Sequence, residues 1–168
     1  LYEDNGVGYF KTHYYGGIRK YQWATIPLAL HGVVTKLNGE TVTVRIGDRP
    51  GDPVFCITDL LPHLAKDQNA KPLGSAFSGE GLNVMIAASP YFEEDGKVTP
   101  ASDKVKLAVL AYLHEQYGMT ESDFMSAELS IVPAANAVDV GLDRWLMGAY
   151  GHDDRVCAYP ALTSLIEN

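Results

Sequence analysis

The sequence has few cysteines, a deficit of positive charge and no long apolar run. Its two cysteines, Cys56 and Cys157, lie far apart, which excludes a disulfide framework or a paired-cysteine metal site. Free thiols are the rule in the cytosol, so we expect a cytoplasmic protein. The formal net charge of −8 excludes a general attraction to nucleic acid or anionic lipid. No apolar stretch approaches the roughly 20 residues that a membrane span needs.

Several catalytic patterns are also missing. The five histidines form no HExxH motif, no serine lies in a GxSxG turn, and no glycine-rich loop matches a nucleotide-binding pattern. His31 and His114 lie in apolar segments, so we interpret them as structural residues. Glu93 and Glu94 stand in a polar loop, where solvated side chains are favoured over a general-base pair.

The chain nevertheless has enough apolar residues for a real core. Hydrophobic residues make up 46% of its 168 positions, which predicts one domain, or one domain with part of another. The chain begins at Leu1 rather than at a methionine, which we interpret as the sign of a fragment or a processed chain.

Apolar patterning predicts mostly strands in the first half and one strong helix in the second. That helix covers residues 103–117, where Ser102 can cap the start and Gly118 ends it. A last helix is expected through 162–166, with Pro160 at its start or at a kink. The predicted strands are 7–15, 26–35, 40–46, 54–57, 82–88, 127–132, 137–142 and 144–149; a short helix is predicted over 59–66, and loops over 67–81 and 89–102.

The dipeptide Asn38-Gly39 predicts a hairpin between two of these strands. Asn-Gly suits the positive φ angles of a type I′ turn, and the strand that follows alternates apolar and polar residues. We therefore expect an antiparallel β core over about 26–88, with this turn at an exposed tip. Strands early and a helix late favour an α+β fold over a regular βαβ winding.

The stretch YGHDDRVCAY, residues 150–159, is the strongest candidate for chemistry. The two oxygens of one carboxylate, that of Asp153 or Asp154, could each take one cation and hold two metals roughly 3.5–4 Å apart. The neighbouring aspartate and Arg155 could then orient the bridging group from outside the metal shell. The alternative is a plain helix start, in which one aspartate caps the helix and both acids favour its N-terminus.

Three stretches in this order resemble one family. They are THYYGGIRKYQW with the apolar run IPLALHGVV, the long helix followed by Glu128-Leu129-Ser130, and GHDDRVCAY. Together they resemble the dinuclear zinc aminopeptidases of the aspartyl aminopeptidase and vacuolar aminopeptidase I kind. The resemblance covers nearly the whole chain, and its tyrosine-glycine-glycine segment is more specific than the Asp-Asp-Arg motif.

The resemblance implies a division of the chain. In that family a β-rich lid domain, which also takes part in subunit association, interrupts an α/β catalytic domain. Residues 24–133 would be an antiparallel, β-barrel-like lid with attached helices. Residues 1–23 and 134–168 would be short flanks of the α/β zinc-exopeptidase catalytic domain.

The resemblance also implies roles for a few residues. Asp153 matches the metal-bridging aspartate, with His152 in a position where the family has leucine. The other ligands and the Glu-Glu general base of the family have no counterpart in this chain. The two divalent metals, which the resemblance implies are zinc, would therefore bind only in a longer parent. A lid histidine that reaches a neighbouring subunit in some members is replaced by Asp67, which puts that role in doubt.

The implied function is removal of N-terminal residues from peptides, with a metal pair lowering the pKa of a bridging water and a glutamate taking its proton. The fragment alone should be inactive. The expected partners are peptide substrates and further copies of the chain. Two rivals stay open: a non-catalytic interaction or oligomerisation module, and a carbohydrate- or peptide-binding β domain with no peptidase parent.

Overall fold

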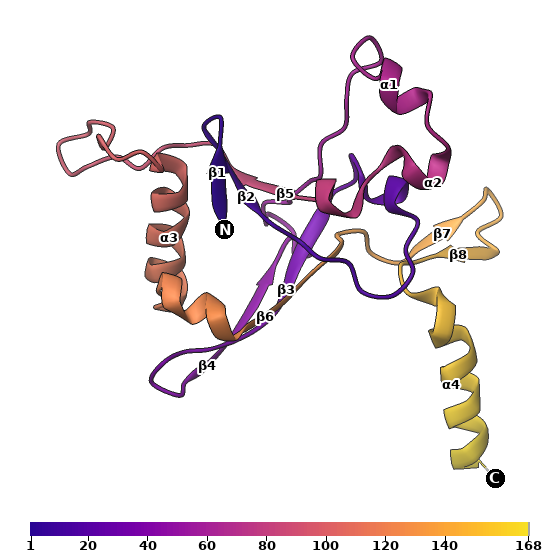
Figure 1. Cartoon of the computed structure of the whole chain (residues 1–168). Helices are drawn as coiled ribbons and strands as arrows, with labels where there is room; N and C mark the ends of the chain where they lie inside the picture. Colours follow the sequence, from indigo (N-terminus) through magenta and orange to yellow (C-terminus); the bar gives the residue numbers. More distant parts are fainter. Residues whose placement is uncertain (168) are drawn as a thin grey trace.

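The structure, a computed structural model, describes residues 1–167 and shows a mixed α/β fold built on small antiparallel sheets (Figure 1). The described sheets have the strand orders β1-β2-β5, β4-β3-β6 and β7-β8, and all three are open, so the barrel-like closure that we expected is not present in the described part. The elements in chain order are β1 (Tyr2–Asp4), β2 (Val7–Phe10), η1 (Lys20–Trp23), β3 (Leu28–Thr35), β4 (Thr41–Ile46), α1 (Lys66–Asn69), α2 (Leu73–Ala76), η2 (Gly79–Gly81), β5 (Val84–Ala87), α3 (Lys104–Tyr117), η3 (Glu121–Ser126), β6 (Ala127–Pro133), β7 (Val138–Val140), β8 (Leu146–Gly148) and α4 (His152–Glu167).

Strand β3 is the centre of the main sheet. It pairs antiparallel with β4 and with β6, so Leu30 lies opposite Ile46 on one side and Ile131 on the other. Leu30 and Val34 are buried, whereas Val33 between them is exposed, which is the alternation that the sequence predicts. Each buried aliphatic side chain stabilises the fold by about 1.5–3 kcal/mol. The predictions of strands at 26–35, 40–46 and 127–132 are confirmed.

The hairpin between β3 and β4 forms at the predicted place with a different turn. Gly39 has φ +84°, but Asn38 is not among the residues with positive φ, so the turn is not type I′. Instead the Gly39 N–H donates to the Lys36 carbonyl and the Lys36 N–H donates to Glu40. This is a three-residue loop that ends in a left-handed glycine. Its tip is exposed, as expected, with Leu37 84% accessible.

Gly32 allows β3 and β6 to approach closely. A Cβ at this position would lie 1.9 Å from the Glu128 carbonyl oxygen, and φ is +153°. Only glycine fits there without moving β6.

The second sheet carries helix α3, and the two are joined by Glu3. The Glu3 carboxylate accepts hydrogen bonds from the Val105 N–H at 2.7 Å and the Lys106 N–H at 3.0 Å. The N–H groups of the first helical turn have no acceptor within the helix. Here a side chain from β1, about a hundred residues earlier in the sequence, accepts from two of them. The predicted Ser102 cap is wrong, because Asp103 is the N-cap residue and makes no side-chain cap bond. Gly118, at φ +62°, ends α3 as predicted.

The connection from α3 to β6 is held by Asp123. Its carboxylate accepts hydrogen bonds from the N–H and hydroxyl of Thr120 and from the Leu37 N–H in the hairpin loop. These bonds, the Thr120 backbone bond first, lower the pKa of Asp123. One carboxylate therefore fixes the end of the main sheet to the α3 side of the molecule.

The region before β5 departs most from the predicted elements. The helix predicted over 59–66 is wrong, because Pro62 lacks an N–H and disfavours helical geometry at Leu61; the short helix α1 begins only at Lys66. The loop predicted over 67–81 contains three short helical turns, and the strand predicted over 54–57 is reduced to isolated bridges. The strand predicted over 82–88 is confirmed as β5.

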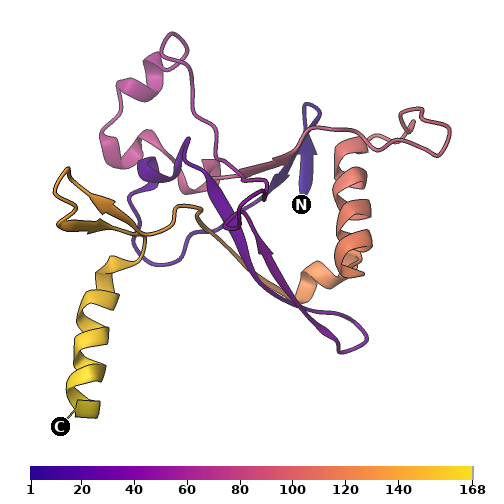
Figure 2. The same cartoon turned by 180° about the vertical axis from the view of Figure 1, so that it is seen from behind.

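The two ends of the chain also differ from expectation. The strand predicted over 7–15 stops at Phe10, and β1 before it was not predicted. The short strands predicted near 137–142 and 144–149 are confirmed as β7 and β8. Helix α4 contains Pro160 in its interior, and its break in helical geometry lies at Asp153 and Asp154, not at the proline. Figures 1 and 2 show α4 projecting from the body of the molecule.

No helix within residues 1–167 is long and apolar enough to cross a bilayer.

Candidate metal centre

Asp153 and Asp154 form an irregular turn where α4 begins. Asp153 is extended, with φ −59° and ψ 134°, and Asp154 has φ 70° and ψ −43°. The Asp154 angles lie near the γ-turn with positive φ, which is rare and strained outside glycine. The Asp154 N–H donates to the Asp153 carboxylate at 3.0 Å. Backbone strain of this kind clusters at functional sites, so we treat the turn at Asp153 and Asp154 as a candidate functional site.

The residues around this turn are open to solvent. His152, Asp153, Asp154 and Arg155 are all exposed, and no ion pair joins Asp154 to Arg155 within the described residues. The guanidinium carbon of Arg155 lies 4.0 Å from the place that a Cβ on Gly151 would occupy. Both readings of the motif therefore persist: the acids do start a helix, and their oxygens remain accessible to a cation.

An aromatic contact ties the turn to the start of the chain. The ring of Trp23, at the end of η1, meets the ring of Tyr150 edge-on, with centroids 6.1 Å apart and planes at 84°. Tyr150 is separated from Asp153 by only two residues. Trp23 and Tyr150, which belong to the two predicted flanks 1–23 and 134–168, thus lie together in space.

The described residues do not complete a metal site. Within residues 1–167 no group of three His, Cys, Asp or Glu side chains could hold an ion. A zinc site takes three or four protein ligands, so Asp153 with its exposed neighbours is too little. The Asp153 carboxylate has the chemistry of a bridging ligand, but the described residues of this chain do not supply the remaining ligands.

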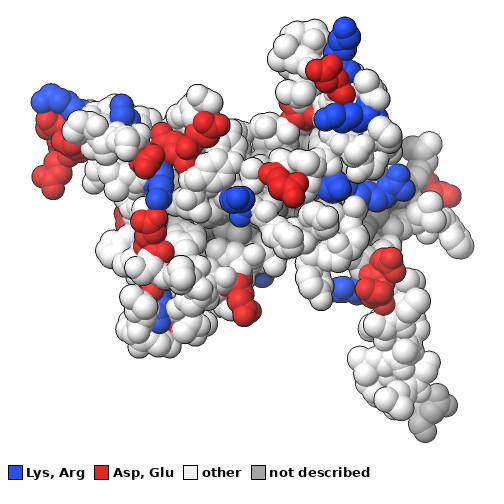
Figure 3. All heavy atoms as spheres, viewed as in Figure 1, with Lys and Arg blue, Asp and Glu red and all other residues white. Residues whose placement is uncertain are grey.

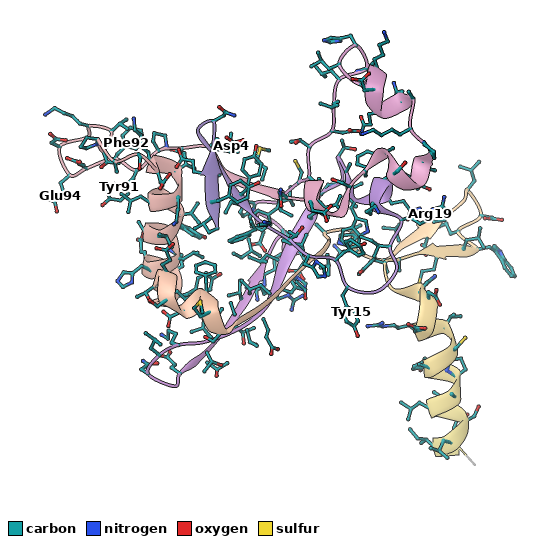
Figure 4. The ribbon with its side chains drawn as sticks, in the orientation of Figure 1. Asp4, Tyr15, Arg19, Tyr91, Phe92 and Glu94 are labelled. Atoms are coloured by element: carbon teal, nitrogen blue, oxygen red, sulfur yellow. The ribbon has the colours of Figure 1, made fainter. Side chains whose placement is uncertain are left out.

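The other candidate acids lie away from this turn. Glu93 and Glu94 are exposed in the loop that precedes α3, and Figure 4 places Glu94 at the opposite side of the molecule from α4. Figure 3 shows acidic and basic atoms side by side on that loop, with further acidic atoms elsewhere on this face. Asp67 lies in the first turn of α1 and is exposed. The prediction that Glu93 and Glu94 are solvated loop residues is in agreement with this placement.

The histidines have local contacts rather than shared ligands. His114 Nδ1 lies 3.3 Å from the Met119 carbonyl oxygen, consistent with the structural role that we expected. His31 Nε2 lies 3.2 Å from Asp48, although without hydrogen-bond geometry. The pKa of Asp48 is lowered, mainly by its hydrogen bond with Arg45. Cys56 and Cys157 are free thiols.

Sequence reasoning missed a groove beside β6. It has a volume of about 720 Å³ and lies between the inner face of β6 and the unpaired segment that follows β2. The aromatic run Thr12–Tyr15 was the available signal, but we assigned it to a strand. Its lining residues include Phe10, Lys11, His13, Tyr14, Trp23, Leu129, Ile131 and Tyr150.

Comparison with known proteins identifies the relatives of this chain. The family described as "Aminopeptidase I zinc metalloprotease (M18)" matches residues 2–168. The chain belongs to the M18 family. This confirms the resemblance seen in the sequence, and the alternative of a β domain with no peptidase relatives is wrong.

Individual M18 relatives match over nearly the whole chain. "Probable M18 family aminopeptidase 1" of Thermotoga maritima is 49% identical over 166 residues, which are 99% of this chain and 35% of that protein. Vacuolar aminopeptidase 1 of Saccharomyces cerevisiae is 23% identical over 171 residues, covering 96% of this chain and 32% of the yeast protein. The crystal structure of aminopeptidase I from Clostridium acetobutylicum superposes with a TM-score of 0.89 at 45% identity, covering 99% of this chain and 36% of that one. This M18 chain thus spans about a third of the length of the curated relatives it matches.

Proposed function

We propose that this chain is part of a metal-dependent aminopeptidase that removes N-terminal residues from peptides. In this proposal residues 24–133 form the lid and oligomerisation domain, and residues 1–23 and 134–168 belong to the catalytic domain. Membership of the M18 family and the names of the relatives support the activity. The contact between Trp23 and Tyr150 supports the division, because it joins the two proposed catalytic flanks at the base of the lid.

The observation that carries the proposal is the turn at Asp153. Asp153 is exposed, and Asp153 and Asp154 have non-helical backbone angles just before the regular part of α4. A carboxylate held in this way can present both oxygens outward. We propose Asp153 as the bridging ligand, with Asp154, His152 and Arg155 around it to orient the carboxylate and balance its charge.

The remaining ligands would come from parts of the polypeptide outside this chain. When bound, a pair of zinc ions supplies Lewis acidity and lowers the pKa of a bound water. The work of this chain would be to hold the pair together through Asp153 and to keep that carboxylate in register through the Asp154 turn. The chain by itself should have no aminopeptidase activity and should bind zinc weakly at most, because it offers too few ligands.

The test combines calorimetry with kinetics. Zinc titrated into the chain should show no tight stoichiometric binding. In the full-length parent, Asp153→Asn should lower kcat/KM by well over the roughly 10–100-fold expected for Asp154→Asn, because a neutral amide cannot bridge two cations. Asp95→Asn, in the distant acidic loop, is the matched control and should leave the rate unchanged. A near-normal rate for the Asp153→Asn parent would overturn the assignment.

A second candidate function is a non-catalytic interaction or oligomerisation module. The proposed lid exposes several large apolar side chains, among them Leu60, Leu61, Leu64 and Leu73, which favour association with a further polypeptide. We propose that copies associate through the lid. Light scattering on the chain tests this directly: a mass that stays monomeric at high concentration would exclude an interface formed by the lid alone. Self-association without zinc-dependent activity in the parent would favour the non-catalytic module.

A further inference from the structure

Strand β6 is an open edge of the main sheet. The order β4-β3-β6 leaves one side of β6 without a partner strand among the described residues. The Ala134 N–H donates to the Pro27 carbonyl, and the register pairs Val132 with Ala29 and Ser130 with His31. Because hydrogen-bonded pairs alternate along an antiparallel ladder, the N–H and C=O of Leu129 and Ile131 point away from β3.

The groove lies along this same edge. The side chains of Leu129 and Ile131 are half-buried and form one wall. Unsatisfied backbone groups next to an apolar groove are the arrangement that accepts an extended peptide as an added strand, with alternate side chains entering the groove.

The groove has two distinguishable ends. At one end Phe10 contacts Phe124, which shortly precedes β6. At the other end Trp23 and Ile131 pack against the same buried cluster, and the ring of Trp23 meets that of Tyr150. From Ala127 to Ile131 the strand rises about 13 Å, at roughly 3.3 Å per residue, so the groove accommodates about four extended residues. The Tyr150 end is the one nearest in sequence to Asp153.

The charge at the other end favours an anionic group. Lys11 follows Phe10 directly and lines the groove, and no lining residue is an Asp or Glu. No acidic residue occurs anywhere between Asn5 and Gly39, although the chain as a whole carries −8. Lys11 has no ion-pair partner within residues 1–167. Figure 4 shows Tyr15 and Arg19 on the same connecting segment, with Tyr15 turned outward and 98% exposed.

We propose that this groove binds the downstream residues of a short peptide substrate as an extended strand on β6. The N-terminal side of the bound segment lies toward Tyr150 and Asp153, and its terminal carboxylate lies toward Lys11. The identity of the occupant as a substrate rests on the proposed aminopeptidase function. The groove, its open edge and its charge do not depend on that function.

The experiment uses the 168-residue chain with EDTA and the probe acetyl-Ala-Val-Ala-Val, whose acetyl group stands in for the upstream peptide bond. Hydrogen exchange followed by NMR should slow at the amides of Leu129 and Ile131. The amides of Glu128 and Ser130, which already face β3, are the internal control and should not change. N-methylation of one central peptide bond of the probe should weaken binding about tenfold, because it removes a donor and crowds the edge.

A pair of variants tests the charge. Lys11→Met should weaken binding of the free-acid probe about threefold, the size expected for an exposed ion pair, and should leave the C-terminal amide probe unaffected. Lys66→Met, on α1, is the matched control and should change neither. Equal effects of Lys11→Met on both probes would overturn the proposed direction of the peptide.

Two further outcomes would overturn the proposal as a whole. One is the absence of any protection at Leu129 and Ile131. The other is protection that rises with protein concentration in the absence of peptide, which would assign the edge to a second copy of the chain. Neither outcome involves zinc or hydrolysis, so failure here is distinguishable from failure of the metal assignment at Asp153.

Discussion

The body of the molecule, residues 1–133, buries many of its large apolar side chains, whereas the C-terminal arm, residues 134–167, leaves its own exposed. Every buried hydrophobic side chain of the described residues lies in the body, between Ala24 and Met119. The arm has a comparable supply of large apolar side chains and buries none of them. Those exposed in the arm are Val138, Val140, Leu142, Trp145, Leu146, Met147, Tyr150, Val156, Tyr159, Leu162, Leu165 and Ile166.

This difference shows that the arm has regular secondary structure but no packed hydrophobic core of its own. The large apolar residues exposed on α4 cover roughly half of the helix circumference, and Figure 3 shows that most of its surface carries no charge. A helix with an apolar face of this width normally packs that face against other elements. The arm therefore has the composition of a core element, which is what the proposal that it belongs to a catalytic domain requires.

The largest expected effect is in hydrogen exchange. Amides of α4 should exchange at least about 10³-fold faster than amides of β3 in this chain, because only β3 shares the global stability of a packed core. In the full-length parent the same α4 amides should become protected. Exchange measured by mass spectrometry on both proteins tests this. An α4 that is already protected in the chain would contradict the contrast between body and arm.

A matched pair of leucine substitutions comes next. Leu28→Ala should lower the free energy of unfolding by about 2–5 kcal/mol, because Leu28 is 0% exposed and its loss leaves a cavity. Leu162→Ala, at 55% exposure in α4, should change it by no more than about 0.5 kcal/mol. Urea denaturation followed by circular dichroism gives both values. Similar losses for the two variants would show that the arm is packed in solution.

A smaller effect is expected at the cap of α3. Glu3→Ala should cost about 0.5–2 kcal/mol, because it leaves the Val105 and Lys106 N–H groups without their acceptor. Asp103→Ala is the control, since the Asp103 side chain makes no cap bond. If thermal unfolding ranks Asp103→Ala as the more damaging change, the cap comes from the local residue after all.

The smallest effect is a pH dependence of the body that comes from Asp123. Its pKa is lowered in the folded state, so its contribution to stability is complete above the unfolded value of about 3.9 and is lost as the pH falls through the folded pKa. The stability difference between the native chain and Asp123→Asn should therefore shrink between pH 5 and the acid limit of folding. Urea midpoints at stepped pH values measure it, and a constant difference would be evidence against the assignment.

Much of the body was predictable because its patterns are local. The alternation in β4, the apolar run of β3 and the glycine after α3 each report on residues within one or two turns. The errors have local causes too. Pro62 prevents the helix that the leucines of residues 59–66 suggested. The turn at Asn38-Gly39 has one left-handed residue, Gly39, whereas a type I′ turn needs two. The candidate Asp153 was found by its motif, and the structure adds the strained Asp154 that no periodicity could indicate.

By itself the sequence determined most of the strands, the long helix, the hairpin position and the family, because these depend on side-chain periodicity, turn residues and short motifs. Only the tertiary structure decided that Glu3 caps α3, that Asp123 holds the hairpin loop, and that β6 ends as an open edge beside an aromatic groove. Each of these joins residues far apart in the chain. Such contacts depend on which elements pack together, a choice made by the burial of apolar surface in the whole fold and not by any single stretch of residues.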